Sequence, residues 1–275
     1  MTFIIICVAL IVERFFHWTH LRHWRWFIRY ERWFNEKTSH WPSRVALIAC
    51  LALPLILVGL IDHFIPNLFY GAVKFIFDVV ILLYCLGPSN LWLQVYRSLS
   101  ELSKDRAAGL EYAQSAFGVV ATDEPQSFHQ AFVRAIFSAA SDRIFSVLFW
   151  YAIAGPAGAV LYRLVSLSSE QSLFGATQFA TQIKNLLDWI PVRIFTFLFA
   201  LCGHFKNVFA HWKPYLFKGL NENALLLNEC GLASLDVVEN GRIPEDGTAE
   251  KETLDLLDRV FVMGLVLLAV VVLLT

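Results

Sequence analysis

The chain has 275 residues, of which 57% are hydrophobic and only 16% charged, and its formal net charge is −1. Soluble domains contain about 45–50% apolar residues, so the composition predicts an integral membrane protein and excludes a soluble globular domain. The near-neutral charge gives no general attraction to nucleic acid, and we expect no nucleic-acid partner. The five cysteines are scattered without CxxC or Cys/His spacing. We therefore predict no disulfide framework and no metal site.

The first apolar run, Thr2–Phe16, is interrupted by Glu13 and Arg14. A spanning helix needs about 17–25 residues, so this run spans the bilayer barely or only dips into it. It begins without a basic region and is followed by no small-residue cleavage site, which indicates a retained anchor rather than a signal peptide.

A basic and aromatic segment, residues 17–41, follows this run. Its arginines recur at helical spacing on one face, while most of its aromatic residues lie elsewhere. We expect an interfacial amphipathic helix on an anionic lipid leaflet. Its membrane-interface residues are Arg22, Arg25, Arg29, Arg32, Trp24 and Trp26. A nucleic-acid surface with stacking aromatics is the weaker alternative, because membrane runs flank the segment.

Two apolar runs, Ser43–Ile61 and Leu68–Leu86, predict a helical membrane hairpin. Lys74 and Asp78 lie four residues apart in the second run, so they share a helix face and can pair. We interpret them as an internal ion pair in preference to a substrate site.

Residues 88–143 are no longer continuously apolar, and their pattern predicts a cytoplasmic helical hairpin. Apolar residues recur at helical spacing from Asn90 to Phe117, with Ser89 as the expected N-cap. A second helix is expected from about Gln126 to Asp142.

Ile144–Leu167 returns to the membrane, and we expect Pro156 and the neighbouring glycines to kink this helix and allow close packing. A polar loop, Ser168–Lys184, then precedes a short membrane helix that begins near Leu187. Pro191 is expected in its first turn, where the missing N–H costs little.

The last part of the chain predicts a cytoplasmic region, residues 206–258, with a mobile acidic loop, and then a short anchor, Val260–Leu274. The three Lys/Arg-rich stretches should share the cytoplasmic side. The predicted fold is a single all-α polytopic membrane domain over residues 1–275. It has about four to six membrane segments and additional cytoplasmic amphipathic helices, and whether the runs 1–16 and 187–205 span stays open.

Ionisable residues at the membrane edges define the candidate site, because such groups usually face a bundle interior or a water-filled cavity. We interpret them first as a polar network between helices. The functional alternative is a pocket for an anionic or amide-bearing ligand, with the arginines as clamps. The candidate residues are Glu13, Arg14, Asp142, Arg143, Arg163, Asp188 and Arg193. Without a GxGxxG, P-loop, HExxH or GxSxG motif, no catalytic residue and no cofactor is assigned.

Three stretches together resemble the AmpE family, and the likeness covers nearly the full chain. They are Val12–Phe15, the block from Leu148 to Leu164 around its Gly-Pro-Ala-Gly-Ala sequence, and Leu187–Arg193. The resemblance implies an inner-membrane protein of Gram-negative bacteria, encoded beside the amidase AmpD, that modulates β-lactamase induction.

AmpE proteins are in turn similar to the cobalamin-biosynthesis membrane synthase CbiB/CobD, which joins an aminopropanol-type amine to a carboxylate of the corrinoid. That similarity implies an acidic pair before the Pro-x-Arg element and a Glu-Asn pair ahead of the kinked helix. Here Leu187 stands beside Asp188, and Ser138-Ala139 takes the place of Glu-Asn. A metal-and-nucleotide site built on those carboxylates would be crippled, so we expect the fold without the enzyme.

The resulting hypothesis is a regulatory protein of the bacterial inner membrane that responds to β-lactams or cell-wall stress. Its expected partners are the lipid bilayer and either a peptidoglycan-derived ligand or a regulatory protein. The alternatives are a membrane-bound amide-forming synthase related to cobalamin biosynthesis and a small-molecule transporter. Inverted repeats would favour the transporter, and the sequence shows none.

Overall fold

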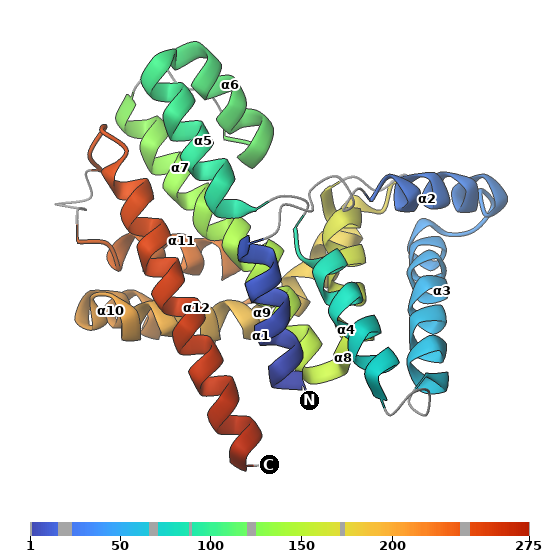
Figure 1. Cartoon of the computed structure of the whole chain (residues 1–275). Helices are drawn as coiled ribbons and strands as arrows, with labels where there is room; N and C mark the ends of the chain where they lie inside the picture. Colours follow the sequence, from blue (N-terminus) through green and yellow to red (C-terminus); the bar gives the residue numbers. More distant parts are fainter. Residues whose placement is uncertain are drawn as a thin grey trace. The chain divides into compact units, whose positions relative to one another are not determined.

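The computed structural model describes residues 2–15, 24–65, 71–87, 90–119, 125–170, 174–236 and 243–274. All regular elements in these ranges are helices, as predicted (Figure 1). They divide between two compact units. The first contains Met1–Pro88 and Ser146–Asp188, and the second contains Ser89–Phe145 and Trp189–Thr275.

The first unit is organised around α8, which packs against α1, α3 and α4. Buried apolar side chains of these helices form its core, among them Ile6 and Leu82, and the large Tyr151 is 2% exposed. The unit also includes the first half of α9. Its elements are α1 (Thr2–Phe15), α2 (Arg25–Lys37), α3 (Ser43–Phe64), α4 (Ala72–Cys85), α8 (Ser146–Glu170) and the start of α9 (Thr177–Cys202).

The second unit is organised around α7, which packs against α5, α6, α11 and α12. Phenylalanines fill its core, with Phe137 against Phe199 and Phe195 against Phe261. Its elements are α5 (Leu91–Lys104), α6 (Arg106–Phe117), α7 (Pro125–Ala140), the π-helical η3 (Ser141–Phe145), the end of α9, α10 (Phe205–Tyr215), η4 (Leu220–Glu222), α11 (Asn223–Ala233) and α12 (Thr248–Leu274).

The helix expected over residues 90–117 begins at a different cap and is divided in two. Asn90, not Ser89, is the N-cap of α5, because its side chain accepts a hydrogen bond from the Leu93 N–H at 3.2 Å. The backbone is extended at Asp105, whose side chain caps a separate helix, α6, through the Ala107 N–H. The expected single helix is therefore two helices packed against each other.

Three further predicted boundaries were also wrong. The α8 helix continues to Glu170, and α9 begins at Thr177, so most of the expected polar loop is helical. Pro191 consequently lies inside α9 and not in its first turn. The C-terminal helix starts at Thr248, well before Val260. Residues 237–242 of the expected mobile loop lie outside the described residues.

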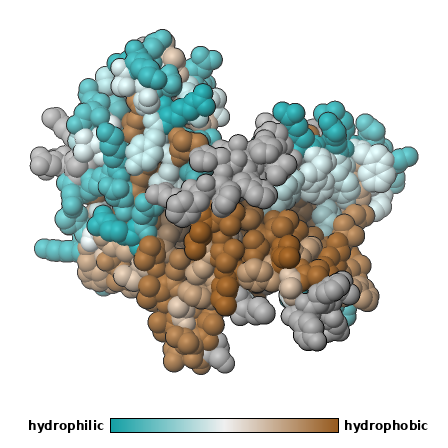
Figure 2. Space-filling view, viewed as in Figure 1, coloured by the Kyte–Doolittle hydropathy of each residue, from teal (hydrophilic) through white to brown (hydrophobic). Residues whose placement is uncertain are grey.

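Four helical runs in the described part of the chain are long and apolar enough to cross a membrane: Ser43–Phe64, Pro125–Glu170, Thr177–Cys202 and Thr248–Leu274. This matches the lower end of the predicted number. Figure 2 shows hydrophobic surface over α3 and over the C-terminal half of α12, where large side chains such as Ile56 and Val266 are exposed, and hydrophilic surface over α5 and α6. An exposed apolar surface of this extent is the one that lipid covers.

Candidate functional site

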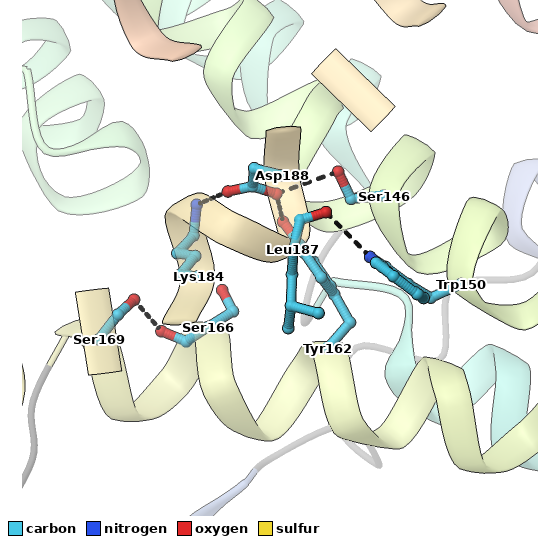
Figure 3. A network of polar contacts seen from close by, with 8 residues as sticks. All are labelled: Ser146, Trp150, Tyr162, Ser166, Ser169, Lys184, Leu187 and Asp188. Carbon is cyan, nitrogen blue, oxygen red and sulfur yellow. Dashed lines mark hydrogen bonds and ion pairs between the residues drawn. The ribbon is translucent and has the colours of Figure 1, made fainter. Parts of the chain in front are cut away.

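Asp188 is the centre of a polar network in the first unit (Figure 3). The residue is 4% exposed, and one oxygen of its carboxylate accepts hydrogen bonds from the Tyr162 hydroxyl at 2.7 Å and the Ser146 hydroxyl at 3.3 Å. The other oxygen pairs with Lys184 Nζ at 2.7 Å. The hydroxyls come from α8, whereas Lys184 lies one turn before Asp188 on α9. These contacts compensate a charge that would be costly to bury alone.

The Leu187 carbonyl is satisfied in an unusual way. Pro191 has no N–H, so the carbonyl four residues earlier in α9, that of Leu187, has no helical donor. The Trp150 indole N–H of α8 donates to this oxygen at 3.2 Å (Figure 3). An unpaired backbone carbonyl is expensive at membrane depth, so this tryptophan makes the proline tolerable inside a membrane helix.

The predicted kink of α8 is confirmed and lies between Trp150 and Tyr162. Ala154 and Gly155 leave helical geometry, and Gly155 has φ +62° and ψ −152°, a region that is essentially restricted to glycine. The close approach expected of the glycines occurs within α8 itself. A Cβ at Gly158 would lie 2.3 Å from the Trp150 carbonyl oxygen. The kink thus separates Ser146 and Trp150 from Tyr162, the third α8 side chain that donates to α9.

Arg193, in the second unit, donates hydrogen bonds to backbone carbonyls rather than to carboxylates. It is 5% exposed, and its guanidinium lies 4.1 Å from the centroid of the Trp189 ring. A buried guanidinium in this segment requires an acidic or carbonyl partner, and carbonyls provide it rather than Asp188 or Asp142. Because α10 ends at Tyr215, the carbonyls of Leu216 and Lys218 beyond it lack helical N–H donors, and Arg193 provides donors for them. Its acceptors are the carbonyls of Leu216, Tyr215, Lys218 and Trp189 and the Asn223 side chain, at 2.7 to 3.2 Å.

The remaining candidate residues divide between the units. Glu13 and Arg163 are buried in the first unit, at 7% and 5% exposure. Asp142 and Arg143 lie in η3 of the second unit. There Arg143 donates to the Gln94 side chain and to the Ala116 carbonyl, both at 2.9 Å, so it joins η3 to α5 and α6. The Arg14 side chain lies outside the described residues. A single pocket formed by all seven residues stays a prediction.

The expected interfacial helix corresponds to α2, although Arg22 lies outside the described residues. The side chains of Arg25, Arg29 and Arg32 are exposed. Trp24 is 7% exposed, and the Trp26 indole donates to the Tyr84 hydroxyl at 2.6 Å. Attachment of this helix to an anionic leaflet remains a prediction.

The structural interpretation of Lys74 is favoured by its contacts. Lys74 pairs with Asp62 across the hairpin and lies 3.8 Å from Asp78. Two carboxylates therefore compensate one cation within the first unit, and no further feature of this cluster indicates transport.

Sequence reasoning missed several residues of the Asp188 network. Lys184 was recoverable, because it precedes Asp188 by four residues, but the segment had been assigned to a loop. Tyr162 and Trp150 carry no local signal that identifies their partners on α9. The pair His129 and Glu250, joined at 2.6 Å in the second unit, was missed because 121 residues separate them.

Comparison with known proteins places the chain in a family. Residues 6–224, most of the chain, match the family described as CobD/Cbib protein. The chain belongs to the CobD/Cbib family. As expected of a CobD/Cbib protein with four apolar spanning runs, it is a multi-pass protein of the bacterial inner membrane.

Two curated relatives support this assignment. The cobalamin biosynthesis protein CobD of Stutzerimonas stutzeri is 27% identical over 231 residues, which cover 78% of this chain and 72% of the relative. A protein of the same name from Chromobacterium violaceum is 28% identical over 120 residues, which cover 41% of this chain and 38% of the relative. No solved structure matches.

These matches correct the functional hypothesis. The expected link to β-lactamase induction and the cell wall is wrong, because the chain belongs to the CobD/Cbib family and both relatives are named cobalamin biosynthesis protein CobD. The matches likewise lend no support to membership in the AmpE group. The part of the resemblance that is confirmed is the relation to the CobD/Cbib membrane proteins.

Proposed function

We propose that this CobD/Cbib protein acts in cobalamin biosynthesis as a membrane-bound synthase that forms an amide bond between an amine and a carboxylate of a corrinoid. The family match over residues 6–224 carries the proposal. The relative named cobalamin biosynthesis protein CobD supports it, because its similarity spans both units of this chain.

The chemistry requires three events. A carboxylate must be activated, the amine must lose a proton and attack the activated carbon, and a carboxylate oxygen must leave as the C–N bond forms. Activation requires a co-reactant such as a nucleoside triphosphate, which takes up that oxygen on phosphorus. The chain's own contribution in the proposal is to hold an anionic substrate in place.

Lys184 is the residue that we propose for this contact. Its side chain is 17% exposed, whereas that of its partner Asp188 is 5% exposed. Asp188 orients the Lys184 ammonium group by accepting a hydrogen bond from it at 2.7 Å. Asp188 in turn is fixed by Tyr162 and Ser146, so it is a positioning residue.

A resident metal does not fit the described residues. No group of three or more His, Cys, Asp or Glu side chains in the described ranges could hold a metal ion. Leu187 and Ser138-Ala139 also occupy the positions where the family resemblance implies carboxylate and amide ligands. We therefore derive no step through a metal.

Complementation tests the proposal. The wild-type chain is expressed in a bacterial strain that lacks its own CobD/Cbib synthase, and corrinoid products are measured by mass spectrometry. We expect the wild-type chain to restore the amidated corrinoid. Lys184→Met should reduce the amount of this product about tenfold or more, because a charged hydrogen bond is lost. Lys206→Met, on the exposed face of α10, should leave the amount unchanged. A wild-type chain that is inserted in the membrane but restores no product would overturn the proposal.

A further inference from the structure

The second unit contains a cavity of about 620 Å³ that the Asp188 network does not use. Residues of α5, α6 and α7 line it together with the turn before α12 and the first turn of that helix. Its volume lies within the range of about 300–1,000 Å³ that is typical of small-molecule sites. Leu99, Leu110 and Phe128 provide an apolar wall.

A buried histidine lines this cavity and has one ring nitrogen engaged elsewhere. His129 lines the cavity and is 9% exposed. Its Nδ1 lies 2.6 Å from Oε1 of Glu250, and Nε2 forms no hydrogen bond with the described residues. Nε2 is therefore the nitrogen left for an occupant of the cavity.

Glu250 orients that histidine through the contact with Nδ1. Its side chain is fully buried, and its second oxygen has no hydrogen-bond partner among the described residues. A buried carboxylate is costly unless a cation compensates it, and His129 is the basic group that contacts it. When both imidazole nitrogens carry a hydrogen, Nδ1–H donates to Glu250 and Nε2–H can donate to an acceptor in the cavity.

Other charges around the cavity also favour an anion. Arg106 and Lys251 line it, and α12 begins there at Thr248 with the positive end of its helix dipole. Two carboxylates lie at the rim as well. Asp246 is occupied in capping Thr248, whose N–H donates to it at 2.9 Å, and Glu245 is exposed to solvent.

We propose that this cavity is a binding site for a small organic anion. The carboxylate or phosphate group of the ligand accepts a hydrogen bond from His129 Nε2, and its apolar part contacts Phe128 and Leu99. The site is independent of the proposed synthase function, because it involves none of the residues of the Asp188 network.

The test uses the full chain in lipid nanodiscs and isothermal titration calorimetry with three probes: benzoate, phenyl phosphate and the neutral benzyl alcohol. We expect at least one anion to bind and benzyl alcohol to bind about tenfold more weakly or not at all, because it cannot replace a charged hydrogen bond. Binding of benzoate alone identifies a carboxylate site, binding of phenyl phosphate alone identifies a phosphate site, and binding of both supports the shared chemistry.

Variants test whether His129 and Glu250 are responsible for anion binding. His129→Gln and Glu250→Gln should each weaken anion binding about tenfold, whereas His211→Gln on the exposed side of α10 should leave it unchanged. If either variant misfolds, nitrogen NMR of wild-type protein with labelled histidine replaces it, and benzoate should shift the His129 Nε2 signal. The proposal is overturned if neither anion binds, if benzyl alcohol binds as tightly, or if His129→Gln folds and keeps full affinity.

Discussion

The contact between Trp150 and the Leu187 carbonyl makes a quantitative prediction. Trp150→Phe removes the indole N–H and leaves that carbonyl without a donor, because Pro191 cannot supply one. An unsatisfied buried acceptor costs about 1–3 kcal/mol, and hydrogen bonds between membrane helices average about 0.6 kcal/mol with a maximum near 1.7. We therefore expect Trp150→Phe to lower the free energy of unfolding by about 1–2 kcal/mol.

The substitution Pro191→Ala separates the free-energy cost of the lost hydrogen bond from the cost of the packing lost in Trp150→Phe. This substitution restores the helical N–H that the Leu187 carbonyl lacks, so Trp150→Phe should cost about 1 kcal/mol less in that background. Unfolding by SDS in mixed micelles, followed by far-UV circular dichroism, measures all four proteins. Trp212→Phe is the matched control, because Trp212 donates at 3.1 Å to the Arg193 carbonyl, which also has its ordinary helical donor. If Trp150→Phe costs the same in the wild-type and the Pro191→Ala backgrounds, the reasoning is refuted.

Three further predictions concern other local features. Gly155→Ala should destabilise the protein by about 1–3 kcal/mol because the backbone there is restricted to glycine, whereas Gly264→Ala, whose Cβ would meet its nearest neighbour at an ordinary 3.6 Å, should be nearly neutral in the same SDS titration. Arg193→Lys should cost on the order of 3 kcal/mol, because one ammonium cannot reach every acceptor of the planar guanidinium; a loss below that of Lys206→Met would contradict it. Hydrogen bonds from Thr248 hold the pKa of Asp246 below its usual range, so its capping of α12 is present above that range and is lost as the pH falls through the lowered pKa. Hydrogen exchange in the first turn of α12 should therefore accelerate in acid, and Asp246→Ala should remove this acid dependence.

Local patterns in the sequence predicted the features that depend on neighbouring residues. The kink near Pro156 follows from the proline and glycines themselves, and the contact of Lys74 with Asp78 follows from their four-residue spacing. The α12 boundary could have been recovered too. Its polar first half was assigned to the cytoplasmic region before the anchor, although Thr253, Leu257 and Phe261 are buried at regular four-residue spacing.

The features that were missed depend on distant parts of the chain. Nothing near Arg193 indicates that its acceptors are carbonyls beyond the end of α10, since backbone oxygens have no signature in a sequence. The approach of Trp150 to Leu187 likewise depends on how α8 packs against α9. The functional hypothesis erred differently, because it rested on a family resemblance and not on local residue spacing.

Arg193 also constrains how this part of the chain can vary. Four of its five acceptors are main-chain carbonyls, and every amino acid carries one. Tyr215, Leu216 and Lys218 can therefore be exchanged without removing a hydrogen bond to the guanidinium, whereas no other side chain can replace Arg193. A comparison of homologous sequences should show an invariant arginine at the position of Arg193, whereas the residues of the turn that it contacts should vary. Covariation between side chains would therefore not reveal this contact.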